Sequence, residues 1–573
     1  MKKVLNYLRG YEKECVLGPL FKLLEASFEL MIPLVVAKIV DVGISSGNQT
    51  VILTQCAVMI LLGFVGLVCA VTAQWFAAKA AVGFGTRLRQ GLLSHILSFS
   101  CSQMDNLGTA AMLTRLTSDV NQVQNGVNLT IRLLLRSPFV VFGAMVMAFT
   151  IDPEAALTFL GVIPVLSIVV FSIMLITMPM YQRVQGALDG VTKAVRQNLS
   201  GVRVLRAFCM EKSQTEEFAS STEDLTRQQI GAGRISALLN PLTFVIINLA
   251  VVILIKIGAV QVEQGILTQG LVIALYNYMG QILVELIKLA NLIINMTKAA
   301  ACGSRIGRVL EQQPDQENGT CEEPIRGQVS FHGVSARYDG ASAPSLQNLS
   351  FTARPGETIG IIGGTGSGKT TLVNLIPRLY DVSEGSVTID GRNVKDYDLS
   401  YLRRQIGLVP QKAELFRGTI RSNLLWGRET ASEQELLEAM KIAQALDLLD
   451  GQQGLDREVS QGGLNFSGGQ RQRLTIARAL VRKPKILILD DSASALDYGT
   501  EARLRKALRA METPPTIFIV SQRAASVRFA DRILVLEDGL LSGMGTHEEL
   551  LESCEVYGEI YYSQFPKEAE NHA

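Results

Sequence analysis

The sequence contains no cysteine pair at the spacing that zinc sites and redox motifs use. Its eight cysteines are scattered over 573 residues, and no two of them form a C-x-x-C motif. Five of them fall in stretches that we expect to face the cytosol, where thiols stay reduced. A zinc site and a disulfide framework are therefore disfavoured. The cysteines are Cys15, Cys56, Cys69, Cys101, Cys209, Cys302, Cys321 and Cys554.

The sequence also lacks a surplus of charge of either sign. Lys and Arg number 54 against 53 Asp and Glu, which gives a net charge of +1. Nucleic-acid-binding proteins usually carry a basic surplus, so we expect no nucleic-acid partner. Charged residues make up 19% of the chain and hydrophobic ones 48%. This balance is expected if about half of the chain lies in a lipid bilayer.

A signal-peptide cleavage site is missing as well. Lys2, Lys3 and Arg9 precede an apolar run, but no small-residue cleavage motif follows it. We therefore expect a retained first membrane span. No internal repeat is present, which predicts one membrane domain and one soluble domain.

Long stretches without a charged residue are the most prominent positive feature. Residues 51–78, 155–182, 235–255 and 264–284 contain none, and a span needs about 20 apolar residues. Residues 129–151 complete another span, and a first, more polar one contains Lys22, Glu25, Glu29 and Lys38. Six transmembrane helices are predicted near 14–40, 51–80, 129–150, 155–180, 236–261 and 266–296.

Loop charge predicts the orientation of these spans. The short connections 41–50, 152–154 and 262–269 contain no Lys or Arg, whereas the two long connections contain many. By the positive-inside rule, both termini and both long loops lie in the cytoplasm. The chain is thus expected to be a multi-pass protein of the cell membrane.

Charged residues inside the first and last spans allow two interpretations. Glu25 and Glu29 share one helix face, and so do Glu285 and Lys288. These side chains either line a cavity that attracts cations, or they pair with one another between helices or are exposed near the cytoplasmic rim.

Beyond the last span the composition changes to that of a soluble domain. Residues 1–310 form the predicted transmembrane domain, and 311–327, rich in Gln, Glu, Pro and Gly, form a linker. Strand and helix patterns alternate over 328–565, which is typical of an α/β nucleotide-binding domain, and 566–573 is a C-terminal tail.

A phosphate-binding loop opens this soluble domain. Its G-x-x-x-x-G-K-T pattern lies between a predicted strand and a predicted helix, so its backbone amides can surround phosphate oxygens. Lys369 is expected at the β- and γ-phosphates and Thr370 at Mg²⁺. Asp490, at the end of an apolar strand, is expected to hold Mg²⁺ as well. The ATP-binding residues predicted here are Gly363, Gly364, Thr365, Gly366, Ser367, Gly368, Lys369, Thr370 and Thr371.

A third motif, Phe-Ser-Gly-Gly-Gln at 466–470, lies between the loop and Asp490. With these three motifs in order, the chain resembles the ATP-binding cassette (ABC) family over nearly its whole length. The resemblance is to a half-transporter of the type IV exporters. It implies six transmembrane helices with long cytoplasmic extensions fused to an α/β cassette, with ATP and Mg²⁺ as cofactors. It also implies short coupling helices, which we place near 101–106 and 208–214.

The same resemblance implies roles for further residues. Tyr338 would stack on adenine, and Gln411 would reach Mg²⁺ or the attacking water. The signature Ser467, Gly468, Gly469 and Gln470, together with Asp497, would face ATP held by a second, homologous subunit.

Two positions depart from the family pattern. Asp491 stands where Glu is usual, and Gln522 stands where the switch His is usual. Asp491 is one methylene shorter, and Gln522 carries neither a proton nor a charge to the γ-phosphate. The chain thus resembles the degenerate-site subunit of heterodimeric bacterial multidrug exporters, whose substrates are small amphipathic compounds. A homodimeric lipid or peptide exporter and an ATP-gated regulatory membrane protein are the alternatives.

Overall fold

The computed structural model describes residues 2–449, 451 and 453–565, which form two compact units. The first unit comprises residues 2–97 and 110–312, and the second comprises 98–109 and 313–565. Residues 98–109 interrupt the first unit in the sequence but pack with the second. The predicted C-terminal tail, 566–573, lies outside the described residues.

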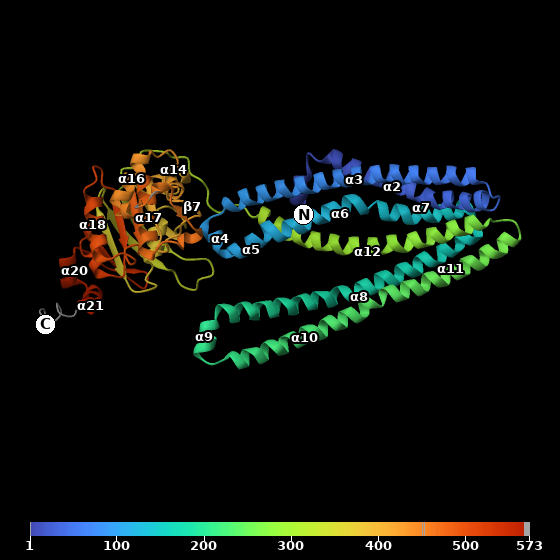
Figure 1. The fold of residues 1–573 in the computed structure, drawn as a ribbon. Helices are drawn as coiled ribbons and strands as arrows, with labels where there is room; N and C mark the ends of the chain where they lie inside the picture. The colour runs from blue at the N-terminus through green and yellow to red at the C-terminus, as the bar shows by residue number, and fades with distance from the viewer. Residues whose placement is uncertain (1, 450, 452, 566–573) are drawn as a thin grey trace. The chain divides into compact units, whose positions relative to one another are not determined.

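The regular elements of the first unit, as far as it is described, are all helices. Figure 1 shows α2 alongside α3 and α8 alongside α10, with α9 joining the ends of the latter pair. The elements are α1 (Lys2–Leu5), η1 (Asn6–Leu8), α2 (Glu12–Lys38), η2 (Ile39–Ile44), α3 (Gln49–Leu97), α5 (Thr109–Thr114), η3 (Arg115–Asp119), α6 (Val120–Leu133), α7 (Arg136–Ile151), α8 (Pro153–Ser200), α9 (Val202–Ala207), α10 (Glu211–Ala237), α11 (Leu239–Glu263) and α12 (Gln269–Glu311).

Five helical runs of the described residues are long and apolar enough to cross a membrane. They are Gln49–Leu97, Thr109–Ile151, Pro153–Ser200, Glu211–Glu263 and Gln269–Glu311. Helix α2, with 27 residues, extends over about 40 Å and packs along α3. Its charged residues keep it out of the apolar set. Together with α2 these runs make the six-helix membrane unit that the sequence predicts.

One predicted boundary in this unit is wrong. The sequence placed the second coupling helix at 208–214, whereas the short helix between α8 and α10 is α9 (Val202–Ala207). Phe208 follows α9, and Cys209 adopts a left-handed φ of 54°, so the chain turns here before α10 begins. Phe208 is 73% exposed. Phe208 therefore lies in the turn after α9 and not in a coupling helix.

The described residues of the second unit form three sheets. Its strands are β1 (Val329–Ala336), β2 (Leu346–Ala353), β3 (Thr358–Gly363), β4 (Glu384–Ile389), β5 (Arg392–Asn393), β6 (Ile406–Val409), β7 (Gly418–Thr419), β8 (Glu458–Val459), β9 (Ile486–Asp490), β10 (Thr516–Val520), β11 (Arg532–Glu537) and β12 (Leu540–Gly545). Its helices are α4 (Cys101–Leu107), α13 (Lys369–Leu375), α14 (Leu399–Gln405), α15 (Ile420–Leu425), α16 (Glu433–Ile442), η4 (Leu446–Leu449), η5 (Gly454–Asp456), η6 (Gln461–Gly463), α17 (Gly468–Val481), α18 (Tyr498–Arg509), α19 (Ala524–Val527), α20 (His547–Ser553) and α21 (Glu555–Gln564).

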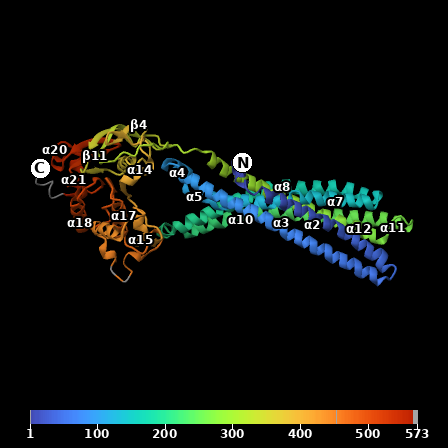
Figure 2. The same cartoon turned by 90° about the horizontal axis from the view of Figure 1, so that it is seen from above.

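The central sheet has the order β12-β11-β3-β10-β9-β6. All its pairings are parallel except that of β11 with the edge strand β12. Both faces are buried: Phe518 and Val520 of β10 join one apolar core, and Ile517 and Ile519 join the other. In Figure 2, β4 of the four-stranded sheet β2-β1-β4-β5 lies on the opposite side of this unit from α15 and α17.

This topology positions the site. The strands β3, β10, β9 and β6 are consecutive neighbours and parallel, so their carboxyl ends lie along one edge. The loops that follow these strands contain the predicted functional residues and therefore converge there.

Candidate functional site

One cavity of about 340 Å³ gathers most of the residues predicted for ATP. It forms where the loops after β3, β6, β9 and β10 meet. The sequence pattern did not single out Ser345, Val520 and Ser521, which also line it. Its lining residues are Tyr338, Ser345, Thr365, Gly366, Ser367, Gly368, Lys369, Thr370, Thr371, Gln411, Asp490, Asp491, Val520, Ser521 and Gln522.

The phosphate loop joins β3 to α13. Gly368 precedes the helix with φ of 92°, and a Cβ there would lie 2.5 Å from the Ser345 carbonyl oxygen. Only glycine fits this position without strain. The Lys369 ammonium donates hydrogen bonds to the carbonyl oxygens of Gly363, at 2.9 Å, and Gly364, at 2.5 Å. These bonds hold the ammonium within the curl of the loop.

Lys369 is a buried cation, since only 8% of the residue is exposed. Burial lowers its pKa, while the carboxylates of Asp491 and Asp490 act in the opposite direction. A multiply charged anion stabilises the charged form of such a lysine, because its negative charge compensates for the water contacts that burial removed.

The two carboxylates after β9 lie in different settings. Asp490 ends the strand, is 4% exposed, and accepts a hydrogen bond of 3.1 Å from the Thr370 hydroxyl. Asp491 has a left-handed φ of 44°, and its amide donates to the Val520 carbonyl at 2.9 Å. Burial raises the pKa of both carboxyl groups. A hydrogen bond to Gln411 and the charge of Arg523 offset part of this shift at Asp491.

Oxygen donors converge on one point of the cavity. The Thr370 hydroxyl donates to the Asp490 carboxylate, and the Gln411 amide group donates to the Asp491 carboxylate, so one hydroxyl and two carboxylates lie close together. Mg²⁺ prefers such hard donors and keeps several ligands for water and phosphate. Among the described residues no group of three or more His, Cys, Asp or Glu is arranged to hold a metal. The Thr370 hydroxyl and the Asp490 carboxylate are oxygen ligands of the kind that fit a Mg²⁺ ion shared with a nucleotide.

The backbone of Gln522, the predicted switch residue, is hydrogen-bonded to α21. Gln522 follows β10, and its carbonyl oxygen accepts a hydrogen bond of 2.9 Å from the Gln564 amide group of α21. The side-chain oxygen of Gln564 accepts another, also 2.9 Å, from the Ala524 backbone amide. The Gln564 side chain thus bonds to two backbone groups of the switch loop, at Gln522 and Ala524. Nothing in the local sequence indicated this contact, because the partners are 42 residues apart.

Tyr338 lies at the cavity rim beyond β1. Its hydroxyl is 3.0 Å from the Thr371 hydroxyl, and its ring meets that of Tyr380 edge-on, with centroids 5.1 Å apart. These contacts present a fixed ring beside the phosphate loop, as stacking on a base requires.

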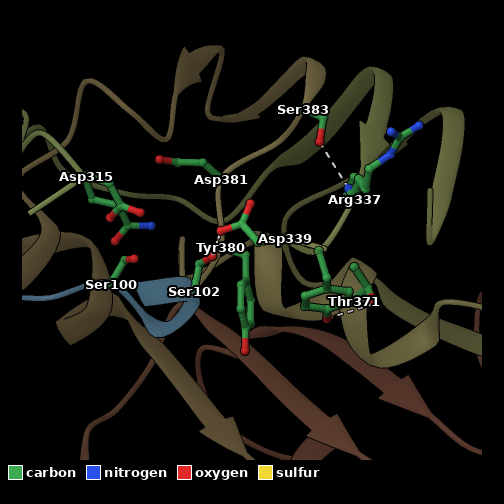
Figure 3. Close-up of a pocket in the computed structure, with 12 residues that line it drawn as sticks. Ser100, Ser102, Asp315, Arg337, Asp339, Thr371, Tyr380, Asp381 and Ser383 are labelled. Atoms are coloured by element: carbon green, nitrogen blue, oxygen red, sulfur yellow. Dashed lines mark hydrogen bonds between the residues drawn. The ribbon is translucent and has the colours of Figure 1, made fainter. Parts of the chain in front are cut away.

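Helix α4 contacts the residue next to Tyr338 (Figure 3). Ser102 and Asn106 both donate hydrogen bonds of 2.8 Å to the Asp339 carboxylate, and these bonds lower its pKa. Tyr380 donates at 2.7 Å to Asp105 of the same helix. Residues at the predicted first coupling helix are thus connected to the rim by direct hydrogen bonds. A cavity of about 270 Å³ lies at this junction.

The signature residues lie in a separate cavity of about 810 Å³, which shares no lining residue with the phosphate-loop cavity. Ser467 caps α17: its hydroxyl accepts from the Gln470 amide at 3.3 Å, and Gln470 accepts from the Ser467 amide at 2.9 Å. Asp497 lines the same cavity and caps α18. The chain therefore keeps the phosphate loop and the Ser467–Gln470 motif in two different cavities.

A cluster of charges in the membrane unit links three helices. Arg136 of α7 donates to Glu285 of α12 at 2.5 Å and to Glu29 of α2 at 2.6 Å. Ser137 and Lys288 also donate to Glu285, which is 2% exposed. For Glu29 and Glu285 the contacts favour interhelical pairing, whereas Glu25 pairs with Lys22 of its own helix. Sequence reasoning missed Arg136, whose partners lie more than 100 residues away.

Two families match this chain. Residues 15–286 match the ABC transporter transmembrane region, and residues 346–494 match the ABC transporter family. An uncharacterized ABC transporter ATP-binding protein of Mycobacterium tuberculosis, MT1311, is 38% identical over 98% of this chain and 97% of its own length.

Other similar proteins agree on the architecture. The uncharacterized ABC transporter ATP-binding protein YfiB of Bacillus subtilis is 37% identical over 99% of both chains. The ATP-dependent lipid A-core flippase of Photobacterium profundum is 30% identical over 88% of this chain and 86% of its own. A bacterial Atm1-family ABC exporter with ATP bound has the same fold, with a TM-score of 0.81, 23% identity and coverage of 97% and 98%.

Proposed function

This chain belongs to the ABC transporter family, and from that premise we propose that it is the ATP-holding, poorly hydrolytic subunit of a heterodimeric exporter. Membership makes it an ATP-binding, ATP-hydrolysing membrane transporter that works with another ABC subunit. The proposal adds the asymmetry of the two ATP sites and the class of cargo, amphipathic compounds moved out of the cytoplasm.

One observation carries the proposal: Asp491 and Gln522, the two residues that depart from the family pattern, line the same cavity. The carboxylate of Asp491 is one methylene, about 1.5 Å, short of the reach of Glu. A misplacement of about 1 Å costs on the order of 10²-fold in rate. Gln522 donates a hydrogen bond but carries no proton to the γ-phosphate. Both residues that would lie beside the reacting γ-phosphate differ from the family pattern, whereas the phosphate loop with Lys369 and Thr370 matches it.

Two half-sites in one chain explain how such a subunit contributes. Its phosphate loop, Asp490, Asp491 and Gln522 would meet the partner's signature, and its own Ser467–Gln470 signature would complete the partner's site. Mg²⁺, when bound, neutralises phosphate charge and orients the γ-phosphate. Thr370, Gln411 and Asp490 would hold it. ATP would bind through contacts that do not involve Asp491 or Gln522, and hydrolysis would occur mainly at the partner's site.

The orientation and domain limits belong to the same proposal. The charged long connections follow the membrane-spanning parts of α3 and α8, and we assign them to the cytoplasm together with both termini. We divide the chain into a transmembrane domain over 1–310, a linker over 311–327 and a cassette over 328–565. The protein would reside in a bacterial cell membrane.

The test compares the chain alone with the complex copurified from its own membranes. The purified chain should show negligible ATPase activity, and the complex should be active. The copurified subunit should have Glu and His at the two altered positions. Robust hydrolysis by the chain alone would refute the heterodimer.

A homodimeric lipid exporter is the second candidate, favoured by the similarity to the lipid A-core flippases. It requires Asp491 to act as the base. Turnover above about 1 s⁻¹ by the purified single chain, within the usual enzyme range, would support it.

A further inference from the structure

The last helix of the described chain, α21, supports the segment that follows β10. This segment comprises Gln522, Arg523, α19 and Arg528, and we call it the switch segment. The amide nitrogen of Gln564 donates a hydrogen bond of 2.9 Å to the Gln522 carbonyl oxygen, and its oxygen accepts one of 2.9 Å from the Ala524 amide. Both ends of one side-chain amide are thus used. Gln564 is exposed, so packing alone gives no reason for a glutamine here.

A second contact lies at the other end of α19. The Arg528 guanidinium lies over the ring of Phe565, 5.7 Å from its centroid, and over that of Phe529, at 4.7 Å. Such cation–π contacts contribute modestly on their own, because water competes for an exposed cation. Together with the two Gln564 bonds, they place contacts from the end of α21 before and after α19. Helix α21 therefore restrains the whole switch segment.

Helix α21 is itself fixed to the domain. Tyr557, Tyr561 and Phe565 recur every four residues, so they lie on one side of the helix. Tyr557 and Tyr561 are 0% and 3% exposed and belong to the apolar core. The ring centroid of Tyr561 lies 4.8 Å from those of Phe565 and of His547 in α20, and the Tyr557 hydroxyl is 2.8 Å from His547 Nδ1. A helix anchored in this way can hold a neighbouring segment in place.

The switch segment leads directly to the nucleotide cavity. Gln522 lines that cavity together with Asp491. The next residue, Arg523, donates a hydrogen bond of 3.0 Å from its guanidinium to the Ser494 carbonyl oxygen. The Ser494 hydroxyl in turn donates to the Asp491 carbonyl oxygen at 2.7 Å. A shift of the switch segment would therefore move Gln522 and also displace the turn that carries Asp491.

We propose that Gln564 is a positioning residue for ATP hydrolysis in this cavity. It lies outside the cavity lining and acts through the backbone from which the Gln522 side chain must reach the γ-phosphate. A glutamine side chain is flexible, so its donor keeps its place only if its backbone does. A displacement of about 1 Å near the reacting atoms lowers the rate by on the order of 10²-fold. The inference rests on the ATP site itself and not on the proposed asymmetry of the two sites.

The experiment compares the complex purified from its own membranes with the Gln564→Met variant, whose new side chain has a similar length but no amide. The partner's catalytic Glu is changed to Gln in both, so that hydrolysis reports this chain's site; a chain that hydrolyses ATP without a partner is measured alone. The kcat should fall about fivefold, because water replaces only part of the two lost hydrogen bonds. The KM for ATP should change by less than about 1.5-fold, because the phosphate loop keeps its contacts.

Hydrogen exchange gives a second measurement that does not require turnover. The Ala524 amide donates to Gln564, so Gln564→Met should speed its exchange at least about threefold in the nucleotide-free complex. Glu559→Met is the matched control, because it places the same side chain at an exposed position of α21, about 140° around the helix from Gln564. It should change neither kcat nor the exchange of Ala524.

Faster exchange with an unchanged kcat would overturn the inference, because the bonds would then hold the segment without aiding the reaction. A fall in kcat without faster exchange would overturn it too, as would a fall in kcat with an equally large rise in KM. If Glu559→Met had the same effects as Gln564→Met, the change would belong to α21 as a whole and the role of Gln564 would be refuted.

Discussion

The buried ion pair between Arg136 and Glu285 should determine the stability of the membrane unit. Arg136 contacts Glu285 and Glu29, and the side chains of Arg136 and Glu285 are only 6% and 3% exposed. The four charges of the cluster, which also includes Lys288, sum to zero. Arg136→Ala would leave Glu285 buried with only Ser137 and Lys288 as donors.

The magnitude follows from the burial of both charges. Removing one member of a buried pair costs about 3–5 kcal/mol, because the remaining charge stays out of water. For a unit of this size, that loss corresponds to a fall of roughly 6 °C or more in the melting temperature. Replacing both residues, Arg136→Met with Glu285→Met, should recover at least half of the loss, because no buried charge is left without its main partner.

Thermal unfolding of the complex in nanodiscs, followed by tryptophan fluorescence, would measure these differences. Arg227→Gln is the matched control, since its pair with Glu223 is 77% exposed on both sides and should contribute almost nothing. If Arg136→Ala unfolds within about 1 °C of the wild type, the pair does not hold the helices together. The same conclusion follows if the double variant is less stable than Arg136→Ala.

Three further predictions concern the nucleotide site. The first uses a complex whose partner has its catalytic Glu changed to Gln. There, Asp491→Glu with Gln522→His should raise the residual ATPase rate at least tenfold, because the longer carboxylate and a side chain that can carry a proton are both restored. Equal rates would show that these two residues do not cause the impairment. Gln564→Ala should lower the ATPase rate of this same site about fivefold with unchanged ATP affinity, because it removes two hydrogen bonds to the switch loop, whereas Ser563→Ala, whose hydroxyl bonds only within α21, should not. Burial raises the pKa of Asp490 and Asp491 above the ordinary 3.8, so protons compete with Mg²⁺ in mild acid. As the pH falls into the acidic range, binding of MgATP should therefore weaken more steeply than binding of metal-free ATP, and parallel titration curves would contradict this.

The sequence alone determined the parts of this protein that depend on local chemistry. A strand, a glycine-rich turn and a lysine at Thr358–Lys369 build a phosphate loop from neighbouring residues, and the structure places that loop in a cavity with Asp490. Long uncharged runs specify membrane helices because lipid leaves their backbone groups no other partner. The cap of α17 by Ser467 and Gln470 is equally local, since its partners are three residues apart.

Tertiary structure decided what links distant segments. Arg136 bonds to Glu285, 149 positions away, and Ser102 bonds to Asp339, 237 positions away. Gln564 bonds to Gln522 in the switch loop, 42 positions away. The position of α9 likewise depends on where the packed helices α8 and α10 turn. A hydrogen bond or a cavity between distant segments exists only once packing has brought them together. No pattern of neighbouring residues specifies that arrangement.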